Sequence, residues 1–153
     1  MIGYLLSFLR FGPIIMLVSR WRCLWFCGCG KRPCLMPGSI VDQPKMVVAG
    51  DHFYVGEYTF LNTVGGLWVG DYVMIGHHAT ILTSKHGTKS PMYCQPLELA
   101  PVVIGNDVLI GCGARIMPGV TIGNHVIVGA NAVVCHDVPD HTTVVGNPAK
   151  ELL

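Results

Sequence analysis

A chain of 153 residues has room for one domain. Its formal net charge of +1, with no stripe of interleaved basic and aromatic residues, argues against a nucleic-acid-binding protein. Only 12% of residues are charged and 51% are hydrophobic, which favours a long apolar interior and faces that meet another copy of the chain.

The first 36 residues differ in composition from the rest and form an apolar arm, for which a helix is one option. Arg10 and Pro13 interrupt the run of about 20 apolar residues that a membrane-spanning helix needs. No basic residue precedes the apolar part and no cleavage site follows it, so a signal peptide is disfavoured. The arm either packs on the protein or, through residues 1–26, lies on a membrane surface, where Trp and Arg are favoured. We expect a cytoplasmic protein, with attachment to the inner membrane face as the alternative.

Four of the seven cysteines lie close together near the end of this arm: Cys23, Cys27, Cys29 and Cys34. Their spacing lacks the C-x2-C pairs that structural zinc sites favour. The cysteines are odd in number and scattered, so we expect free thiols in a reducing compartment and no bound metal.

A six-residue repeat begins weakly at Val55 and Leu61 and is clear at Val69, Ile75 and Ile81. Between Thr83 and Pro101 the repeat is lost, and three prolines interrupt the segment. We expect residues 83–101 to form a loop that protrudes between two coils. A loop of this length on a regular scaffold is a candidate for function.

Six unbroken hexads follow from Ile104 to Pro139 and predict an all-β fold, a parallel β-helix over residues 40–153. Three hexads complete one coil, so Ile104 should stack on Ile122, Ile110 on Val128 and Ile116 on Val134. The first positions are branched and the fifth are small or β-branched: Ile104, Ile110, Ile116, Ile122, Val128 and Val134, then Val108, Ala114, Val120, Val126, Ala132 and Val138.

Glycines occupy the second position of four hexads, at Gly105, Gly111, Gly123 and Gly129. We expect them at corners with positive φ, where glycine has no Cβ penalty. The tail, residues 138–153, should leave the repeat through Pro139 and Pro148 and end in a short helix or an extended arm.

The segments VVIGNDVLIGCGARIMPGVTIGNHVIVGANAVV and DVPDHTTVVGNPAK resemble the hexapeptide-repeat acyltransferases, and the likeness covers about residues 46–153. Within this family the chain is most similar to galactoside, maltose and nodulation-factor acetyltransferases and to polysaccharide O-acetyltransferases. The resemblance implies a left-handed β-helix, a homotrimer with sites at subunit boundaries, acetyl-CoA as co-substrate, and a sugar or glycan hydroxyl as acceptor.

His86, in TILTSKHG, matches the catalytic histidine that the resemblance implies at the start of the protruding loop. As general base it would take the proton of the acceptor hydroxyl, because neutral imidazole predominates near neutral pH. A solvated loop histidine is the alternative interpretation.

The resemblance also implies that Asn62, in TFLNT, binds the acceptor, although asparagine is equally suited to a tight corner. His78 is a candidate for the acceptor pocket; with His77, it is otherwise a surface histidine near a corner.

For the cofactor, the resemblance implies a groove that holds pantetheine largely through backbone amides. Its residues here would be Cys112, Ala130, Cys135 and Lys150. The N–H of Cys112 would face the oxyanion and Lys150 a phosphate. Two positions depart from the family pattern. Leu109 replaces a tryptophan that shapes the substrate cleft, and His136 replaces a lysine near the phosphates.

Two other functions stay open. A γ-class carbonic anhydrase shares the fold but needs three converging histidines, and His77, His78, His125 and His136 lack that family's spacing. A trimeric scaffold or binding module without activity is also compatible with the sequence. We favour the O-acetyltransferase.

Overall fold

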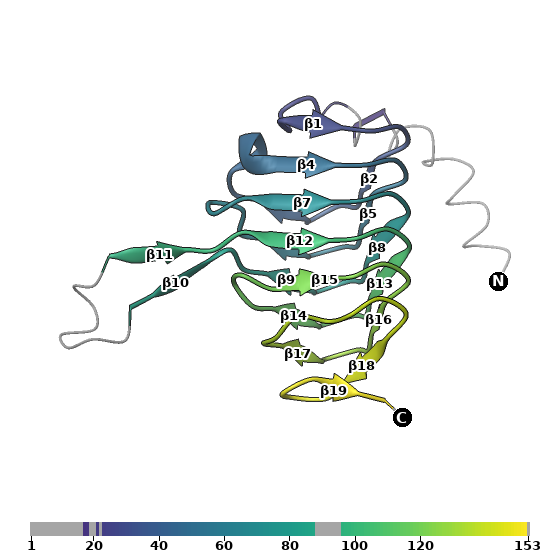
Figure 1. Cartoon of the computed structure of the whole chain (residues 1–153). Coiled ribbons are helices and arrows are strands. Elements are labelled where there is room, and N and C mark those ends of the chain that lie inside the picture. Colours follow the sequence, from purple (N-terminus) through teal and green to yellow (C-terminus); the bar gives the residue numbers. More distant parts are fainter. Residues whose placement is uncertain (1–16, 19–20, 22, 88–95, 153) are drawn as a thin grey trace, which may run out of the picture.

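A computed structural model describes residues 17–18, 21, 23–87 and 96–152 of the chain. It shows an all-β parallel solenoid of about five turns (Figure 1). Each complete coil contributes one short strand to each of three sheets, here called A, B and C. With the first coil uppermost, the strands of sheet A run from left to right across the front of Figure 1, and the chain returns behind them through sheets B and C. The winding is therefore left-handed, as expected.

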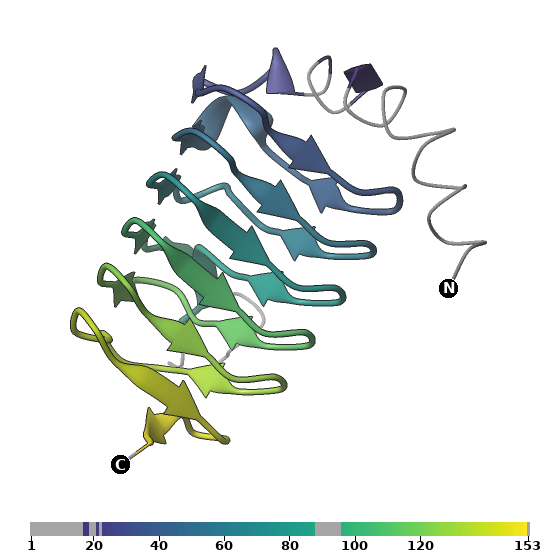
Figure 2. The ribbon, with the colours of Figure 1, turned by 90° about the vertical axis from the view of Figure 1, so that its right-hand side faces the viewer.

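The strands stack in three ladders, which Figure 2 shows as successive layers. Sheet A contains β1 (Gly28–Cys29), β4 (Val47–Ala49), β7 (Leu67–Val69), β12 (Val102–Ile104) and β15 (Thr121–Ile122). Sheet B contains β2 (Cys34–Leu35), β5 (Tyr54–Val55), β8 (Val73–Ile75), β13 (Val108–Ile110), β16 (Ile127–Val128), β18 (Thr143–Val145) and β19 (Lys150–Glu151). Sheet C contains β3 (Ile40–Val41), β6 (Phe60–Leu61), β9 (Thr80–Ile81), β14 (Arg115–Ile116) and β17 (Val133–Val134).

The predicted register of the hexads is confirmed. Ile104 pairs with Ile122, Ile110 with Val128 and Ile116 with Val134. All first and fifth positions of the six hexads are buried, with at most 5% of their surface exposed. Because successive residues of a strand point to opposite faces, the branched residues form one continuous column inside the prism. This column is the hydrophobic core.

The earlier coils are longer. Val55 pairs with Ile75 and Leu61 with Ile81, a spacing of 20 residues, whereas Ile104 and Ile122 are 18 apart. The extra residues lie between sheets C and A, where the first coil also contains the 3-10 turn η1 (Pro44–Met46). The widened corner is therefore the place where the solenoid accommodates insertions.

The solenoid includes residues that the sequence analysis placed in the arm. β1 pairs with β4, and β2 pairs with β5, so both strands belong to the first coil. Cys23 and Phe26 are buried and cover the top of the core. Residues 1–16 lie outside the described part of the chain, so the predicted fate of the arm stays a prediction there. In the part that is described, no helix is long and apolar enough to cross a bilayer.

Between β9 and β12 the chain leaves the solenoid in an antiparallel hairpin, the hairpin stem, formed by β10 (Ser84–His86) and β11 (Leu97–Leu99). It projects sideways from the middle of the stack (Figure 1). The predicted protrusion is confirmed, with paired strands at its base; residues 88–95 lie outside the description.

The tail does not form a helix or an extended arm. β18 continues sheet B beside β16, and β19 folds back antiparallel to β18. Inward and outward side chains alternate from Thr142 to Val145, and Val144 is buried in register with Val128. The chain therefore completes another strand after Pro139.

The reason given for the second-position glycines is also wrong. Positive φ occurs at the fourth position of the hexad, at Asp107, Gly113, Gly119, His125 and Asn131. The second-position glycines are required because neighbouring coils come very close. A Cβ on Gly111 would lie 2.5 Å from the backbone nitrogen of Ala130, and one on Gly105 would lie 2.8 Å from the carbonyl carbon of Gly123.

Candidate active site: two half-sites on one chain

The candidate residues lie at the corners of the prism, which we name by the sheets they join. Corner AB follows the strands of sheet A, corner BC follows those of sheet B, and corner CA follows those of sheet C and bears the hairpin stem. Each corner stacks on the same corner of the next coil. A residue's corner is therefore set by its position within the coil, which spans 20 residues in the early coils, 18 in the central ones and 16 in the last.

His86 ends β10 and is exposed. Its backbone pairs with Leu97, while the preceding pair, Lys85 and Glu98, adds an ion pair of 3.5 Å between Nζ and Oε2. Because side chains alternate along a strand, Ser84 and His86 point to one face of the stem and Lys85 to the other. The imidazole is therefore presented beside corner CA on an ordered strand.

Asn62 fixes the start of this stem. Its Nδ2 donates to Oδ2 of Asp42 in the preceding coil at 2.6 Å. Its Oδ1 accepts from the backbone N–H of Thr83 at 3.2 Å and from the hydroxyl of Ser84 at 3.0 Å. Thr83 is fully buried. These contacts are those of a positioning residue, and contact between Asn62 and an acceptor stays a prediction.

Corner BC carries backbone N–H groups without a partner. Cys112 and Ala130 are exposed and lie one coil apart, where the N–H of Asn131 donates to the carbonyl of Cys112 at 2.9 Å. Among the hydrogen bonds of the described residues, none uses the N–H of Cys112 or Ala130. Both groups are therefore open to a ligand that runs along this corner.

At corner AB, by contrast, the equivalent N–H groups are satisfied in every coil before the last. There each third-position side chain accepts from the backbone N–H of the coil before it, at 2.7 to 2.9 Å. The ladder runs through Lys31, Asp51, Asp71, Asn106, Asn124 and Asp140. At corner BC the residues one coil on from Cys112 and Ala130 are Ala130 and Gly146, which have no side-chain acceptor, so both backbone N–H groups stay free.

His78 also lies at corner BC, with φ of 56°, and its ring stacks on Tyr58 with centroids 5.3 Å apart. Beside it, Nδ1 of His77 accepts from the N–H of Glu57 at 3.0 Å. His78 precedes β9, whereas His86 ends the following strand β10. Within one chain they belong to different corners.

Two predicted cofactor residues, Lys150 and Cys135, lie at different corners of the solenoid. Lys150 lies on β19 and pairs with Val145, the last residue of β18. The chain turns between these two residues at the end of corner BC. Cys135 follows β17 and lies at corner CA, with its thiol 3.8 Å from the carbonyl of Val133. The last coil is shorter, because Val128 pairs with Val144, and the next position of the Cys112 column after Ala130 is therefore Gly146. Within one chain Cys135 therefore lies at another corner than Cys112 and Ala130, and its contact with the cofactor stays a prediction.

The two departures from the family pattern are both exposed. Leu109 lies on the outer face of sheet B between Met74 and Ile127. His136 is next to Cys135 at corner CA. The histidines considered for a zinc enzyme lie at three different corners, with His125 at corner AB, where its Nδ1 is 2.9 Å from Oδ2 of Asp107. In the described part of the chain, no three His, Cys, Asp or Glu residues are grouped to hold a metal ion.

The structure thus separates the candidates into two half-sites. The hairpin half-site contains Asn62, Ser84 and His86 at corner CA. The corner half-site contains His78, Cys112, Ala130 and Lys150 at corner BC. Sequence reasoning missed Ser84 and Tyr58. The alternation of SKH in a strand would have marked Ser84, and the 20-residue spacing would have marked Tyr58 beneath His78.

Comparisons with known proteins agree with this architecture. A family model described as "Bacterial transferase hexapeptide (six repeats)" matches residues 101–136. Nodulation protein L of Rhizobium meliloti is 38% identical over 121 residues, covering 74% of this chain and 66% of that protein. A maltose O-acetyltransferase from Clostridium difficile superposes with a TM-score of 0.81 and 30% identity, covering 86% of this chain and 71% of the other.

A hexapeptide-repeat acetyltransferase of Vibrio cholerae, solved in complex with acetyl coenzyme A, superposes with a TM-score of 0.82 and 32% identity over 86% of this chain and 73% of the other. Together with the fold, these similarities show that the chain belongs to the hexapeptide-repeat acetyltransferase family. The chain spans 58 to 66% of the length of the first curated relatives that it matches.

Proposed function

We propose that this protein transfers an acetyl group from acetyl-CoA to a hydroxyl of a sugar or glycan, with His86 as general base. The observation that carries the proposal is the hairpin stem, which interrupts an otherwise regular solenoid and presents His86 at a corner. A solenoid gains no stability from such an excursion, whereas an exposed imidazole on an ordered strand suits proton transfer. Relatives that act as sugar O-acetyltransferases support the choice of acceptor.

The chemistry follows from the two half-sites. His86 takes the proton of the acceptor hydroxyl as its oxygen attacks the thioester carbonyl of acetyl-CoA. The negative charge that develops on the carbonyl oxygen is held by a backbone N–H, for which the unpartnered group of Cys112 is the candidate. The C–S bond then breaks, and the CoA thiolate leaves and takes up the proton from His86. The products are the acetyl ester and free CoA.

With the N–H of Cys112 directed at the thioester carbonyl, the open N–H of Ala130 on the next coil is left to donate to an amide carbonyl of pantetheine. Coils are spaced by about 4.8 Å, which matches an extended ligand lying along the prism. Lys150, exposed at the end of the same corner, supplies a positive charge for a CoA phosphate. Cys135, at corner CA, could line this groove only from a neighbouring copy.

The complete site forms between two copies. Sheet A carries Val48, Trp68 and Val103 on its outer face, and sheet B carries the column Tyr54, Met74, Leu109 and Ile127. Apolar faces of this kind favour contact with another copy. If sheet A of one copy meets sheet B of the next, the hairpin stem of the first adjoins corner BC of the second. Repeating this contact around a threefold axis closes a homotrimer with three sites.

The test is acetyl transfer by His86→Ala, measured as free CoA released in the presence of simple sugars, nucleotide sugars and lipid-linked glycans. Loss of a general base should lower the rate by about 100- to 10,000-fold. Lys85→Ala, on the opposite face of the same strand, is the matched control and should retain the rate. Full activity of a folded His86→Ala protein would overturn the mechanism.

The scaffold alternative is tested in the same assay. If the wild-type protein binds acetyl-CoA but transfers the acetyl group to none of these acceptors, a binding module becomes the better interpretation. A protein that remains monomeric in light scattering at micromolar concentration would remove the shared site.

A further inference from the structure

The end of the solenoid formed by the first coil exposes an apolar surface that the proposed chemistry does not use. Leu17, Val18 and Trp21 are exposed, and Leu24 and Trp25 expose 73% and 57% of their surface. Residues 17, 18, 21 and 23 are helical, and residues 24 and 25 form the turn that follows. Cys23 and Phe26 face the core instead. The apolar stripe is therefore largely exposed beside the first coil, where Trp21 and Trp25 line a pocket with Phe26.

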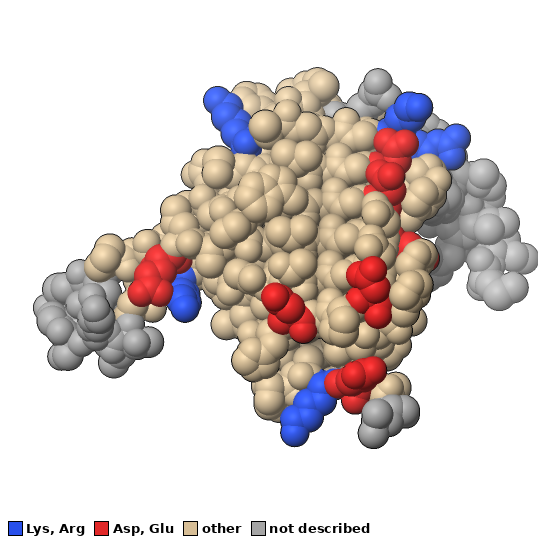
Figure 3. All heavy atoms as spheres, viewed as in Figure 1, with Lys and Arg blue, Asp and Glu red and all other residues tan. Residues whose placement is uncertain are grey.

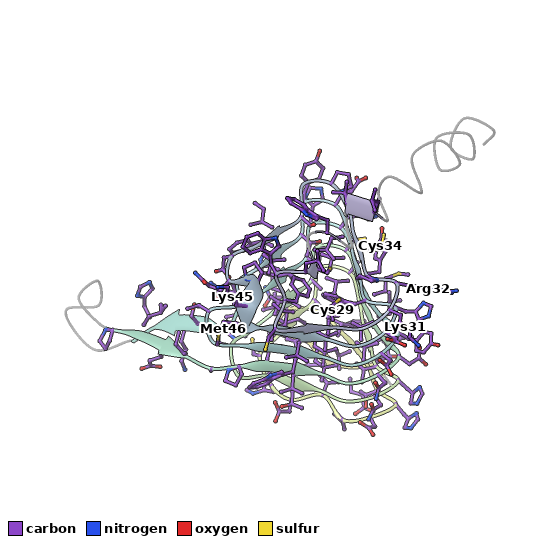
Figure 4. The ribbon with its side chains drawn as sticks, turned by 90° about the horizontal axis from the view of Figure 1, so that it is seen from above. Cys29, Lys31, Arg32, Cys34, Lys45 and Met46 are labelled. Atoms are coloured by element: carbon purple, nitrogen blue, oxygen red, sulfur yellow. The ribbon has the colours of Figure 1, made fainter. Side chains whose placement is uncertain are left out.

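Basic side chains surround this stripe. Lys31 and Arg32 are exposed at corner AB of the first coil, and Lys45 is exposed on η1 at corner CA. Figure 4, which looks down on the first coil, shows Lys31 and Arg32 on one side of this end and Lys45 on the other. In Figure 3, Lys and Arg side chains mark the same end, and most of the acidic side chains lie farther along the solenoid.

The charge asymmetry is large for a nearly neutral chain. Residues 1–45 contain six Lys and Arg and one Asp, a net charge of +5, whereas residues 46–153 contain four Lys and Arg and eight Asp and Glu, a net charge of −4. The acidic groups nearest the first coil are engaged within the protein. Asp42 accepts hydrogen bonds from Asn62 and Thr63, and Asp51 accepts one from the backbone N–H of Lys31.

We propose that this end of the solenoid docks on an anionic phospholipid bilayer. Tryptophan and leucine on one face, with lysine and arginine around it, is the composition of segments that lie at the membrane interface. Anionic headgroups attract the cations, and the tryptophan rings enter the boundary between headgroups and acyl chains. The solenoid axis then stands along the membrane normal, with the first coil nearest the lipid and the hairpin stem projecting parallel to the surface.

The first test measures co-sedimentation of the full chain with vesicles of phosphatidylcholine alone or mixed in equal parts with phosphatidylglycerol. The wild-type protein should bind the acidic vesicles and release them as salt increases. The double variant Lys31→Glu/Arg32→Glu should bind about thirtyfold more weakly, because each basic residue near the surface contributes a few-fold. Arg115→Glu/Lys150→Glu, which makes the same charge change away from this end, is the matched control and should retain binding.

The second test does not require a charge variant. A Trp68→Phe protein keeps only Trp21 and Trp25 as tryptophan fluorophores, since the chain has three tryptophans. Their emission should shift to shorter wavelength when acidic vesicles are added, because the rings leave water.

Several results would overturn the proposal. These are no binding to acidic vesicles, equal binding to neutral vesicles, equal weakening by the two double variants, or an unshifted emission in the bound state. A protein partner at this end would give the first of them. None of these measurements depends on acetyl transfer, so failure here leaves the proposed function standing.

Discussion

Oδ1 of Asn62 accepts a hydrogen bond from the hydroxyl of Ser84 at 3.0 Å, and this contact links the second coil to the strand that carries His86. The same oxygen receives the N–H of the buried Thr83, while Nδ2 of Asn62 holds Asp42. Three successive coils are therefore connected at the point where the hairpin stem leaves the solenoid. The position of the imidazole depends on this connection.

Asn62→Ala should lower the free energy of unfolding by about 2 kcal/mol, because the N–H of Thr83 loses its partner in a buried position. It should also lower kcat by about ten- to a hundredfold with little change in KM, since misplacing a catalytic group slows the chemical step. Denaturant titration and steady-state kinetics measure the two effects. A rise in KM at unchanged kcat would instead make Asn62 an acceptor ligand.

Gly111→Ala should destabilise the protein by about 2 kcal/mol, because the added Cβ would lie 2.5 Å from the nitrogen of Ala130 and the coils would have to separate. Gly28→Ala is the matched control, since its Cβ would meet only Val48 Cγ1 at 3.6 Å. That variant should be neutral or slightly stabilised. Thermal and denaturant unfolding measure the stability of both variants. An equal loss of stability in Gly111→Ala and Gly28→Ala would contradict the explanation by close contact between coils.

Two inactive variants should complement one another if the site is shared between copies. Ala130→Trp blocks the corner half-site, and His86→Ala removes the base from the hairpin half-site. After unfolding and refolding of an equal mixture, about a quarter of the sites combine an intact hairpin with an intact corner, so about a quarter of wild-type activity should return. Activity no greater than that of the separate variants would place both halves on one chain.

Asp140 should make stability depend on pH in the acid range. The backbone N–H and then the side-chain amide of Asn124 donate to this carboxylate and hold its pKa below the ordinary value. A lowered pKa stabilises the folded state above the ordinary value, near pH 4, and the contribution is lost as the pH falls through that range. Asp140→Asn keeps an accepting oxygen but cannot titrate. Unfolding curves from about pH 6 to pH 3 should therefore fall more steeply for wild type, and parallel curves would contradict this.

Cys29 should react with iodoacetamide faster than an ordinary thiol. A hydrogen bond from Cys23 lowers the pKa of Cys29, and outweighs burial and the Asp51 carboxylate, which raise it. A lower pKa gives more of the reactive thiolate near neutral pH. In Cys23→Ala the alkylation of Cys29, followed by peptide mass spectrometry with exposed Cys135 as internal reference, should slow. An unchanged ratio of the two rates would contradict the role of Cys23.

The central hexads were predicted well because their contacts repeat at a fixed sequence interval. Ile104, Ile110 and Ile116 stack on residues 18 positions later, and each must be apolar to fill the prism. The first coil was missed because β1 and β2 occur within a generally apolar segment, where cysteine and glycine replace the regular pattern. The closing β18–β19 pair was missed because the prolines in the tail suggested that the repeat had ended.

By itself, the sequence determined the solenoid, the register of its six hexads and the place where the repeat breaks, because these depend on a periodic apolar pattern. Only the tertiary structure assigned each candidate to a corner. Within one chain, it separated Cys135 from Cys112 and put His78 and His86 at different corners, on either side of β9. It also showed that Asp and Asn side chains satisfy the backbone at corner AB and leave Cys112 and Ala130 open at corner BC. Those relationships depend on which coils are in contact, and the repeat pattern alone does not contain them.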